Sequence, residues 1–259
     1  MTSHRDRAPL GIQYTSALTR PLKAAEDTAR AIVHTIVEDG LQVGEKLPSE
    51  AKMLDYYRVS RQSLREALRL LEVQGLIELK RGPGGGPVVA GVDAAHFGRM
   101  SSLPFHLVGV TYEELVEAWA FADGQLAALA ARRVADEAVR TSLDLYLEVR
   151  PSAPEGVEIE EYVDLHSHFH HTLGGLCGNK ALELTLTSFR LIFSHHLLFE
   201  LDPRRLGPVV EREHADIARA VLAGDEELSR KLSEDHVHTV ANYYVDDNGR
   251  SLDALVEWR

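Results

Sequence analysis

The chain lacks the features of several common protein classes. Its 259 residues include one cysteine, Cys177, which excludes disulfide frameworks and cysteine-based zinc fingers and fits a reducing compartment. No segment contains the roughly 20 uninterrupted apolar residues that a membrane-spanning helix needs. The basic N-terminus is not followed by a hydrophobic run, so no secretory signal is expected. The composition therefore predicts a cytoplasmic protein without a membrane partner.

Positive charge is scarce overall, but the shortage is confined to one part of the chain. There are 28 Lys and Arg against 40 Asp and Glu, a formal net charge of -12. Residues 1–90 hold 13 basic and 11 acidic residues, whereas the remainder holds 15 and 29, together with 11 of the 13 histidines. An acidic chain is not expected to bind nucleic acid. A near-neutral first third joined to an acidic remainder, however, is compatible with nucleic-acid binding by that first third. Two domains with different roles are predicted.

Residues 21–90 have the element order of a winged helix-turn-helix. Apolar residues at helical spacing predict a first helix over 21–39. Ser49 and Ser60 each stand where a side-chain oxygen can cap the helix that follows, and Gly75 ends the second of these helices. The pattern predicts three short helices, of which the last two form a helix-turn-helix.

A β-hairpin is predicted to follow the third helix. Residues 76–79 and 87–89 are rich in strand-forming side chains, and the loop between them is rich in glycine. A phosphate-binding loop is excluded here, because no Lys-Ser or Lys-Thr pair follows the glycines and the run opens a strand rather than a helix. The hairpin is therefore interpreted as the wing.

The rest of the chain is predicted to be helical. A capping box over 111–114 opens the first long helix, and helical periodicity then continues across 111–246. We expect a flexible arm over 1–20, a linker over 91–110 and a tail over 247–259. The predicted fold class is mainly α, with an N-terminal winged helix-turn-helix that carries a small β-hairpin wing and a C-terminal all-α helical bundle.

The third helix offers different chemistry on neighbouring faces. At about 100° per residue, Leu64, Leu68 and Leu71 form an apolar stripe that can pack on the other two helices. The adjacent arginine stripe suits a major groove, where arginine binds guanine edges or phosphates. The expected DNA-binding residues are Ser49, Lys52, Ser60, Arg61, Gln62, Arg65, Arg69, Lys80 and Arg81. The alternative interpretation is an ordinary basic helix face exposed to solvent. The surrounding helix-turn-helix and wing favour the DNA-binding interpretation.

Three segments resemble the winged-helix head of GntR-family transcription regulators. They are residues 44–50 (GEKLPSE), 59–68 (VSRQSLREAL) and 71–77 (LEVQGLI). The resemblance covers about residues 21–90 and implies a homodimer on a palindromic operator in double-stranded DNA, with Arg61 and Arg65 among the contacts. The family commonly has an arginine after the glutamate of its LPSE motif, where this chain has Ala51, followed by Lys52.

Histidines occupy positions in the second domain where leucines ordinarily sit. Three of the expected helices carry them on their inward stripes, namely His166, His170, His214 and His236. Two of these, His166 and His170, are four residues apart and can chelate one ion from one helix face. A buried histidine needs a hydrogen-bond partner or a metal, so the alternative to a shared metal site is a set of satisfied core histidines. Surface or interface positions are expected for His195, His196 and His238.

The same region resembles the all-helical ligand-binding (FCD) domain of the FadR branch of that family. The matching segments are 169–173 (FHHTL), 213–217 (EHADI) and Gly224-Asp225 with His236 eleven residues later. Such members typically bind a divalent metal through an Asp and three His, and a small organic acid completes the coordination. By position, the three histidine ligands are His170, His214 and His236, and His166 stands where the Asp ordinarily does. An all-histidine site favours zinc, with nickel as the next choice.

The expected effector-binding residues are Trp119, Asp123 and Arg190. The family usually has an arginine in the first helix of this domain, near the effector carboxylate, and this chain has Trp119. Trp119 offers an apolar stacking surface, and plain core packing is its alternative role. Arg190 is a candidate to hold an anionic ligand. The expected effector is a carboxylic acid that is less acidic, or more aromatic or apolar, than in typical relatives.

The leading functional prediction is a transcription repressor whose operator affinity is controlled by a small molecule at the metal site. A metal sensor, in which the ion itself is the signal, is the first alternative. A metal-dependent hydrolase with an accessory DNA-binding head is the second. No HExxH or Gly-x-Ser-x-Gly motif is present, and Glu213, the nearest candidate general base, is expected to be solvated. The protein is therefore not expected to be an enzyme.

Overall fold

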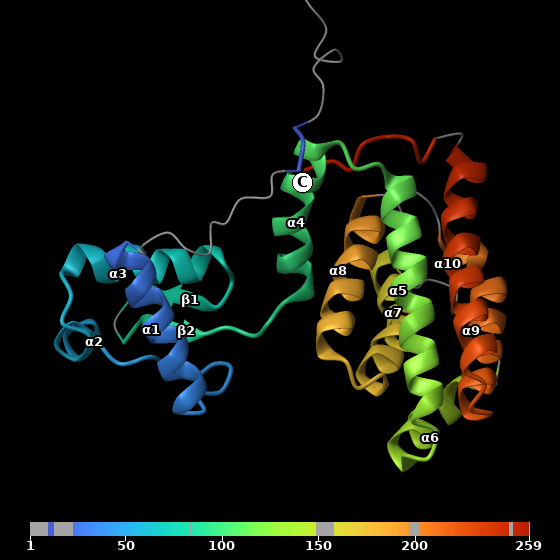
Figure 1. Ribbon diagram of the computed structural model, residues 1–259, viewed down its shortest axis with the longest axis horizontal. Coiled ribbons are helices and arrows are strands. Elements are labelled where there is room, and N and C mark those ends of the chain that lie inside the picture. Colours follow the sequence, from blue (N-terminus) through green and yellow to red (C-terminus); the bar gives the residue numbers. More distant parts are fainter. Residues whose placement is uncertain are drawn as a thin grey trace, which may run out of the picture. The chain divides into compact units, whose positions relative to one another are not determined.

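The chain folds into two compact units, which Figure 1 shows in a computed structural model. The structure describes residues 10–12, 23–82, 84–148, 158–196, 203–248 and 251–258. The unit called the head here comprises Ile12–His96, and the helical unit comprises Phe97–Arg259 with Met1–Gly11. One two-stranded hairpin lies among many helices, as the sequence predicted for the fold class. None of the helices in the described ranges is long and apolar enough to cross a membrane.

The head contains three helices and a hairpin in the predicted order. These elements are α1 (Ala24–Glu38), α2 (Glu50–Tyr57), α3 (Arg61–Val73), β1 (Ile77–Lys80) and β2 (Gly86–Val89). Both predicted serine caps are confirmed, because Ser49 Oγ accepts from the Lys52 backbone N–H at 3.5 Å and Ser60 Oγ accepts from that of Ser63 at 3.1 Å. Each cap satisfies a backbone donor that a helix start would otherwise leave without a partner.

The core of the head lies between the helices and the hairpin. Ile32, Met53 and Leu64 contribute fully buried side chains from the three helices, and Ile77 contributes one from β1. The two strands are antiparallel, with Ile77 opposite Val89. The turn before α2 adds to the free side of β2, since the Leu47 N–H donates to Pro87 O and the Val89 N–H donates to Glu45 O. The wing is therefore fastened to the helix-turn-helix through backbone hydrogen bonds.

The helical unit is built around one central helix. Its elements are α4 (Ala94–Val108, which starts in the head), α5 (Tyr112–Arg132), α6 (Glu137–Leu143), α7 (Ile159–Leu176), α8 (Lys180–His196), α9 (Gly207–Leu222) and α10 (Glu226–Asn248), with short 3₁₀ turns at Asp144–Tyr146 and Pro203–Leu206. The predicted capping box at Thr111 and Glu114 opens α5. Helix α5 packs against α7, α8, α9 and α10 (Figure 1). Its many buried alanines allow these close approaches.

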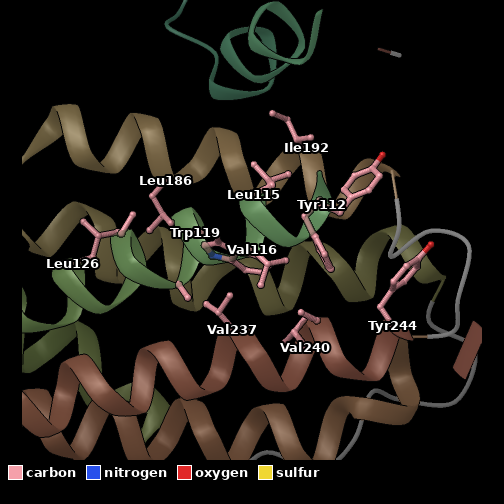
Figure 2. Packing of buried hydrophobic residues seen from close by; sticks show 14 of the residues in the cluster. Tyr112, Leu115, Val116, Trp119, Leu126, Leu186, Ile192, Val237, Val240 and Tyr244 are labelled. Carbon is pink, nitrogen blue, oxygen red and sulfur yellow. The ribbon is translucent and has the colours of Figure 1, made fainter. Parts of the chain in front are cut away.

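Apolar side chains from α5, α8 and α10 fill the main core of this unit. Figure 2 shows Trp119 and Val116 of α5 among Leu186 of α8 and Val237 of α10. A second cluster, which includes Phe169 and Leu173 of α7, lies along the other part of α5. The metal-ligand candidates of α7, α9 and α10 come from the helices that these two clusters hold together.

A helix occupies the stretch expected to be a linker. Helix α4 covers most of residues 91–110, although Pro104 and Gly98 interrupt its sequence pattern. Gly98 is needed for packing, because a Cβ there would lie 3.1 Å from the Ser188 backbone oxygen of α8. The absence of sustained periodicity therefore reflected a close helix contact rather than an extended chain.

The C-terminal residues pack against the bundle, whereas the sequence suggested a tail over 247–259. The Val256 N–H donates to Val110 O at 2.8 Å, the Tyr112 N–H donates to Ala254 O at 3.0 Å, and the Val256 side chain is fully buried. Leu255 and Thr111 form an antiparallel bridge. A single short pairing of this kind has no periodic sequence signal, so only the fold reveals it.

Candidate functional site

Three of the four predicted histidine ligands converge in the helical unit. One ring nitrogen from each of His170, His214 and His236 lies within 4.8 Å of the others. His236 Nε2 is 3.2 Å from His214 Nε2 and 3.2 Å from His170 Nε2. All three side chains are buried, and they come from α7, α9 and α10. We call these three residues the histidine cluster.

Carboxylates hold the outer nitrogens of two cluster members. His236 Nδ1 donates to Glu213 Oε2 at 2.8 Å, and the Thr239 hydroxyl donates to the other oxygen of Glu213 at 2.9 Å. His170 Nδ1 lies 3.4 Å from Asp123 Oδ1, and the Ser233 hydroxyl donates to Asp123 Oδ2 at 2.6 Å. A neutral imidazole with its proton on Nδ1 presents a lone pair at Nε2. The Glu213 carboxylate therefore orients the Nε2 lone pair of His236 toward the centre of the cluster, and Asp123 lies on the corresponding outer side of His170.

Burial keeps two of the cluster imidazoles, those of His170 and His214, neutral. Burial lowers the pKa of His170 to about 4, although the Asp123 carboxylate acts in the opposite direction. Burial, followed by the neighbouring His236 and His170, lowers the pKa of His214 well below its usual value. Burial alone would raise the pKa of Asp123, but His170 and Ser233 outweigh it and the net pKa is lowered. At neutral pH the group is thus a pair of neutral imidazoles next to an ionised carboxylate, and neutral imidazole is the form that binds metals.

The cluster geometry fits a divalent transition metal. Zinc–nitrogen bonds of about 2.0–2.1 Å in a tetrahedron place neighbouring nitrogens about 3.3 Å apart. The observed 3.2 Å separations match that spacing. Imidazole nitrogens suit zinc and nickel rather than magnesium or calcium, which prefer oxygen ligands. His170, His214 and His236 would hold the ion, and Asp123 and Glu213 would orient two of them.

His166 lies beside the cluster but outside it. Its Nε2 is 3.3 Å from Glu211 Oε1, and its ring centroid is 6.3 Å from that of His214. The sequence placed His166 on the same stripe as His170, and the two do lie on the same helix. The described structure therefore joins three of the four proposed ligands and pairs His166 with a carboxylate.

The three expected effector-binding residues are all buried. Asp123 contacts His170 directly, as described above. Arg190 of α8 is 4% exposed, and its guanidinium donates to Ser167 O at 3.3 Å and to His171 Nε2 at 3.1 Å. Burial lowers the pKa of Arg190 to about 10, so the side chain remains a cation at neutral pH. Trp119 is 2% exposed and packs its ring 5.3 Å from Phe193.

Two residues behave differently from the sequence expectation. Glu213 is not simply solvated, since both of its oxygens accept hydrogen bonds from α10. His196 is buried rather than at the surface, and its Nδ1 lies 3.0 Å from the Tyr112 hydroxyl. His195 and His238 are exposed, as expected. No local sequence signal indicates either contact, because each partner comes from a distant part of the chain.

The head exposes the predicted DNA-binding face of α3. Leu64, Leu68 and Leu71 are buried in the core, whereas the neighbouring polar stripe is exposed at every position, namely Arg61, Gln62, Arg65 and Arg69. Arg65 Nη2 lies 3.4 Å from Glu50 Oε1, but its side chain is still 70% exposed. The face is therefore accessible and positively charged.

The remaining DNA-binding candidates lie at the ends of helices and strands. Ser49 and Ser60 use their hydroxyls as helix caps, and Lys52 is exposed on the first turn of α2. Lys80 ends β1, and Arg81 follows it, both exposed. The wing loop is held by Lys46, whose Nζ donates to Gly84 O at 2.6 Å. The arrangement offers cations from both the recognition helix and the wing.

Comparisons with known proteins identify two family domains in the chain. Residues 24–85 match the model of bacterial regulatory proteins of the gntR family, and residues 114–239 match the FCD domain. The Glc operon transcriptional activator of Escherichia coli strain K12 is 27% identical over 232 residues, covering 85% of this chain and 88% of that protein. The HTH-type transcriptional repressor NanR of Enterobacter sp. strain 638 is 26% identical over 207 residues, covering 76% of each.

A solved structure supports the same fold. The structure described as Streptococcus agalactiae GntR aligns with a TM-score of 0.57 at 20% sequence identity, covering 85% of this chain and 99% of that one. The matched families and the relatives above are regulators of transcription rather than enzymes.

Proposed function

Because the chain belongs to the GntR family of bacterial regulatory proteins and carries an FCD domain, we propose that a ligand bound in its helical unit controls how tightly its head binds an operator. The proposed ligand is a small organic acid, held together with a divalent metal, most simply zinc, at His170, His214 and His236. The proposal is carried by the convergence of the three imidazoles, in which His236 Nε2 lies 3.2 Å from both His214 Nε2 and His170 Nε2. His166 is proposed as an additional ligand only by its position in the sequence.

The chain's own residues have distinct parts in this site. Glu213 fixes the proton of His236 on Nδ1, so that its Nε2 is free to bind, and Asp123 lies 3.4 Å from Nδ1 of His170. When bound, a divalent ion supplies an open coordination position for a carboxylate oxygen. Arg190, a buried cation, supplies a second point of attraction for an anion. Burial strengthens both interactions by excluding water.

On the DNA side, we propose a homodimer that binds a palindromic operator in the cytoplasm. The exposed arginines of α3 would enter the major groove, and Lys80 and Arg81 of the wing would contact the backbone or the minor groove. Repression is the proposed sign of regulation. A ligand that binds one arrangement of the dimer better than another shifts the population between the two arrangements. The ligand then changes the affinity for the operator, and the operator changes the affinity for the ligand by the same factor.

The proposal is tested by metal analysis combined with operator binding. Purified protein should contain about one zinc or nickel ion per chain. A fluorescent duplex from the promoter of its own gene should be bound specifically at moderate salt, and removing the metal or adding a carboxylic acid should change that affinity. Protein that contains no metal and binds the duplex equally well after chelation and reloading would refute the metal-linked part of the proposal.

A metal sensor is the second candidate, and the cluster geometry favours it as well. If zinc alone changes operator affinity to the full extent, and a panel of carboxylic acids has no further effect, the ion is the signal. The hydrolase alternative is set aside, because the matched families and relatives are regulators.

A further inference from the structure

An ion pair joins the two helices of the helix-turn-helix on the face that carries the exposed arginines. Arg65 Nη2 of α3 lies 3.4 Å from Oε1 of Glu50, the first residue of α2. Among the described residues, Arg65 is the only arginine of the exposed α3 stripe with a carboxylate partner. Glu50 is therefore an anion placed directly beside a side chain that is expected to contact DNA.

Stability of the head does not account for this pair. The side chains of Arg65 and Glu50 are 70% and 43% exposed, and ion pairs between exposed residues contribute little to stability. Helices α2 and α3 already share a buried core that includes Met53 and Leu64. A glutamate in the first turn of a helix also interacts favourably with the helix dipole, but that interaction needs no contact with another helix. The contact with Arg65 therefore calls for a separate explanation.

The position of Glu50 is unfavourable for DNA affinity alone. Duplex DNA carries a dense negative charge, so a carboxylate beside the recognition helix is repelled by the phosphates. The ion pair also has no net charge, which reduces the attraction between Arg65 and phosphates. A protein that only needed to bind DNA tightly would gain affinity by losing this carboxylate. Its presence favours a role in distinguishing one DNA sequence from another.

The pair leaves Arg65 able to bind the edge of a base. A guanidinium is planar and carries five N–H donors, and Glu50 contacts one of its terminal nitrogens, Nη2. The other donors can bind O6 and N7 of a guanine, which accept two hydrogen bonds from an arginine in the major groove. A side chain that is oriented before DNA binds loses less conformational freedom on binding, so its directional contacts contribute more to affinity.

We propose that Glu50 is a positioning and specificity-determining residue for DNA recognition. Its carboxylate holds the guanidinium of Arg65 in the orientation that binds a guanine edge, and it disfavours contact between that guanidinium and phosphates. The inference rests on the proposed binding of an operator by the head, and it is independent of the metal and the ligand of the helical unit. It adds a carboxylate to a recognition surface that otherwise offers cations and neutral polar groups.

The test measures base-pair preferences of the full chain with and without the carboxylate. The probes are the fluorescent duplex from the promoter of its own gene, duplexes in which one base pair at a time is replaced, and a shuffled duplex of equal composition. Arg65→Ala identifies the guanine concerned, because replacing that guanine no longer weakens binding to this variant. Glu50→Gln should reduce the penalty for replacing the same guanine by about 3-fold or more, and should leave the other positions unchanged.

The shuffled duplex provides a second measurement. Glu50→Gln should bind it more tightly than the unaltered chain does, because one anion is removed and the guanidinium of Arg65 is free to contact phosphates. Each base-pair penalty is a ratio of two affinities of the same protein, so a smaller folded fraction in the variant cancels from it. The penalty therefore reports on recognition even if the substitution weakens the fold.

Glu66→Gln is the matched control. Glu66 follows Arg65 on α3 and is exposed, and its substitution changes the charge of the chain by the same amount. This variant should change the affinities for all the duplexes by a similar factor and should keep the full penalty at the guanine assigned to Arg65.

Four results overturn the inference. In Glu50→Gln, a full penalty at the Arg65 guanine would mean that the pair does not position Arg65, and equal losses at every base pair would mean that Glu50 supports the whole helix-turn-helix. The same loss in Glu66→Gln would assign the effect to charge alone, and an Arg65→Ala variant with unchanged base preferences would show that Arg65 does not bind a base. Failure of the unaltered chain to bind the promoter duplex specifically refutes the operator proposal itself, and this result is obtained before any variant is made.

Discussion

The head and the helical unit use the same kind of helix to place ionisable residues in opposite environments. In the head, α3 buries its leucines and exposes its arginines, which remain solvated charges. In the helical unit, α7, α9 and α10 bury histidines at positions that ordinarily carry leucine. Water around the arginines preserves their charge for contact with phosphates and bases. Loss of water lowers the pKa values of His170 and His214, so these two imidazoles are neutral and able to bind a metal.

The strongest test of this contrast removes one cluster imidazole. His214→Ala should reduce zinc affinity by about 100-fold or more, because four ligands of a zinc site share roughly 10–16 kcal/mol of binding free energy. Metal content after dialysis against a chelating buffer measures the effect. His238→Ala, which alters an exposed imidazole on α10, should retain the metal. Equal metal content in the two variants would show that the cluster is not the binding site.

The matching test in the head removes one exposed arginine. Arg65→Ala should weaken specific operator binding by about 1–3 kcal/mol if the side chain binds a guanine edge. Its metal content should not change. Arg30→Ala, at an exposed position of α1 outside the recognition face, is the control and should have little effect. Fluorescence anisotropy at fixed salt measures the operator affinities of the two variants. Equal losses of specific and non-specific binding in Arg65→Ala would show that Arg65 contacts the DNA phosphates rather than a base.

Acidity should destabilise the helical unit through its buried histidines. Burial lowers the pKa of His170 from 6.5 to about 4, so the unfolded chain takes up that proton first as the pH falls. The stability due to the neutral imidazole is complete above about pH 6.5 and is lost between about 6.5 and 4. From pH 7 to 5, metal-free protein should lose about 2 kcal/mol of unfolding free energy from this residue alone.

Denaturant unfolding followed by circular dichroism measures that slope. His214 acts in the same direction, because its pKa is also lowered. The lowered pKa of Asp123 acts only at more acidic pH, below its usual value of 3.8. His170→Asn should flatten the pH dependence, and an unchanged slope in that variant would contradict the role given to burial.

The smallest expected effect concerns the two serine caps of the head. Ser60→Ala should cost about 1 kcal/mol of head stability, because its hydroxyl accepts from the Ser63 N–H at 3.1 Å. Ser49→Ala should cost less, since the corresponding distance is 3.5 Å. Thermal melts of the two variants give the order directly. The reverse order would mean that the hydrogen-bond distance does not decide the strength of these caps.

Local patterns were sufficient to predict the head. The serine caps, the leucine stripe of α3 and the glycine-rich hairpin loop each depend on residues within a few positions of one another. Such signals survive in the sequence because helix capping and helical periodicity act over one or two turns. Helix α4 was the exception. Gly98 and Pro104 are residues that usually interrupt helices. The close packing of Gly98 against the Ser188 backbone explains why a glycine occupies this position in α4.

By itself, the sequence determined which helices would form and which of their faces would be apolar. It placed His170, His214 and His236 on inward stripes, since side-chain direction follows from the 3.6-residue repeat. Only the tertiary structure decided that the three imidazoles meet, that Glu213 and Asp123 lie at the outer nitrogens of two of them, and that His166 lies beside Glu211. The physical reason is range: periodicity is a property of one helix, whereas the meeting of three helices depends on the packing of the whole core.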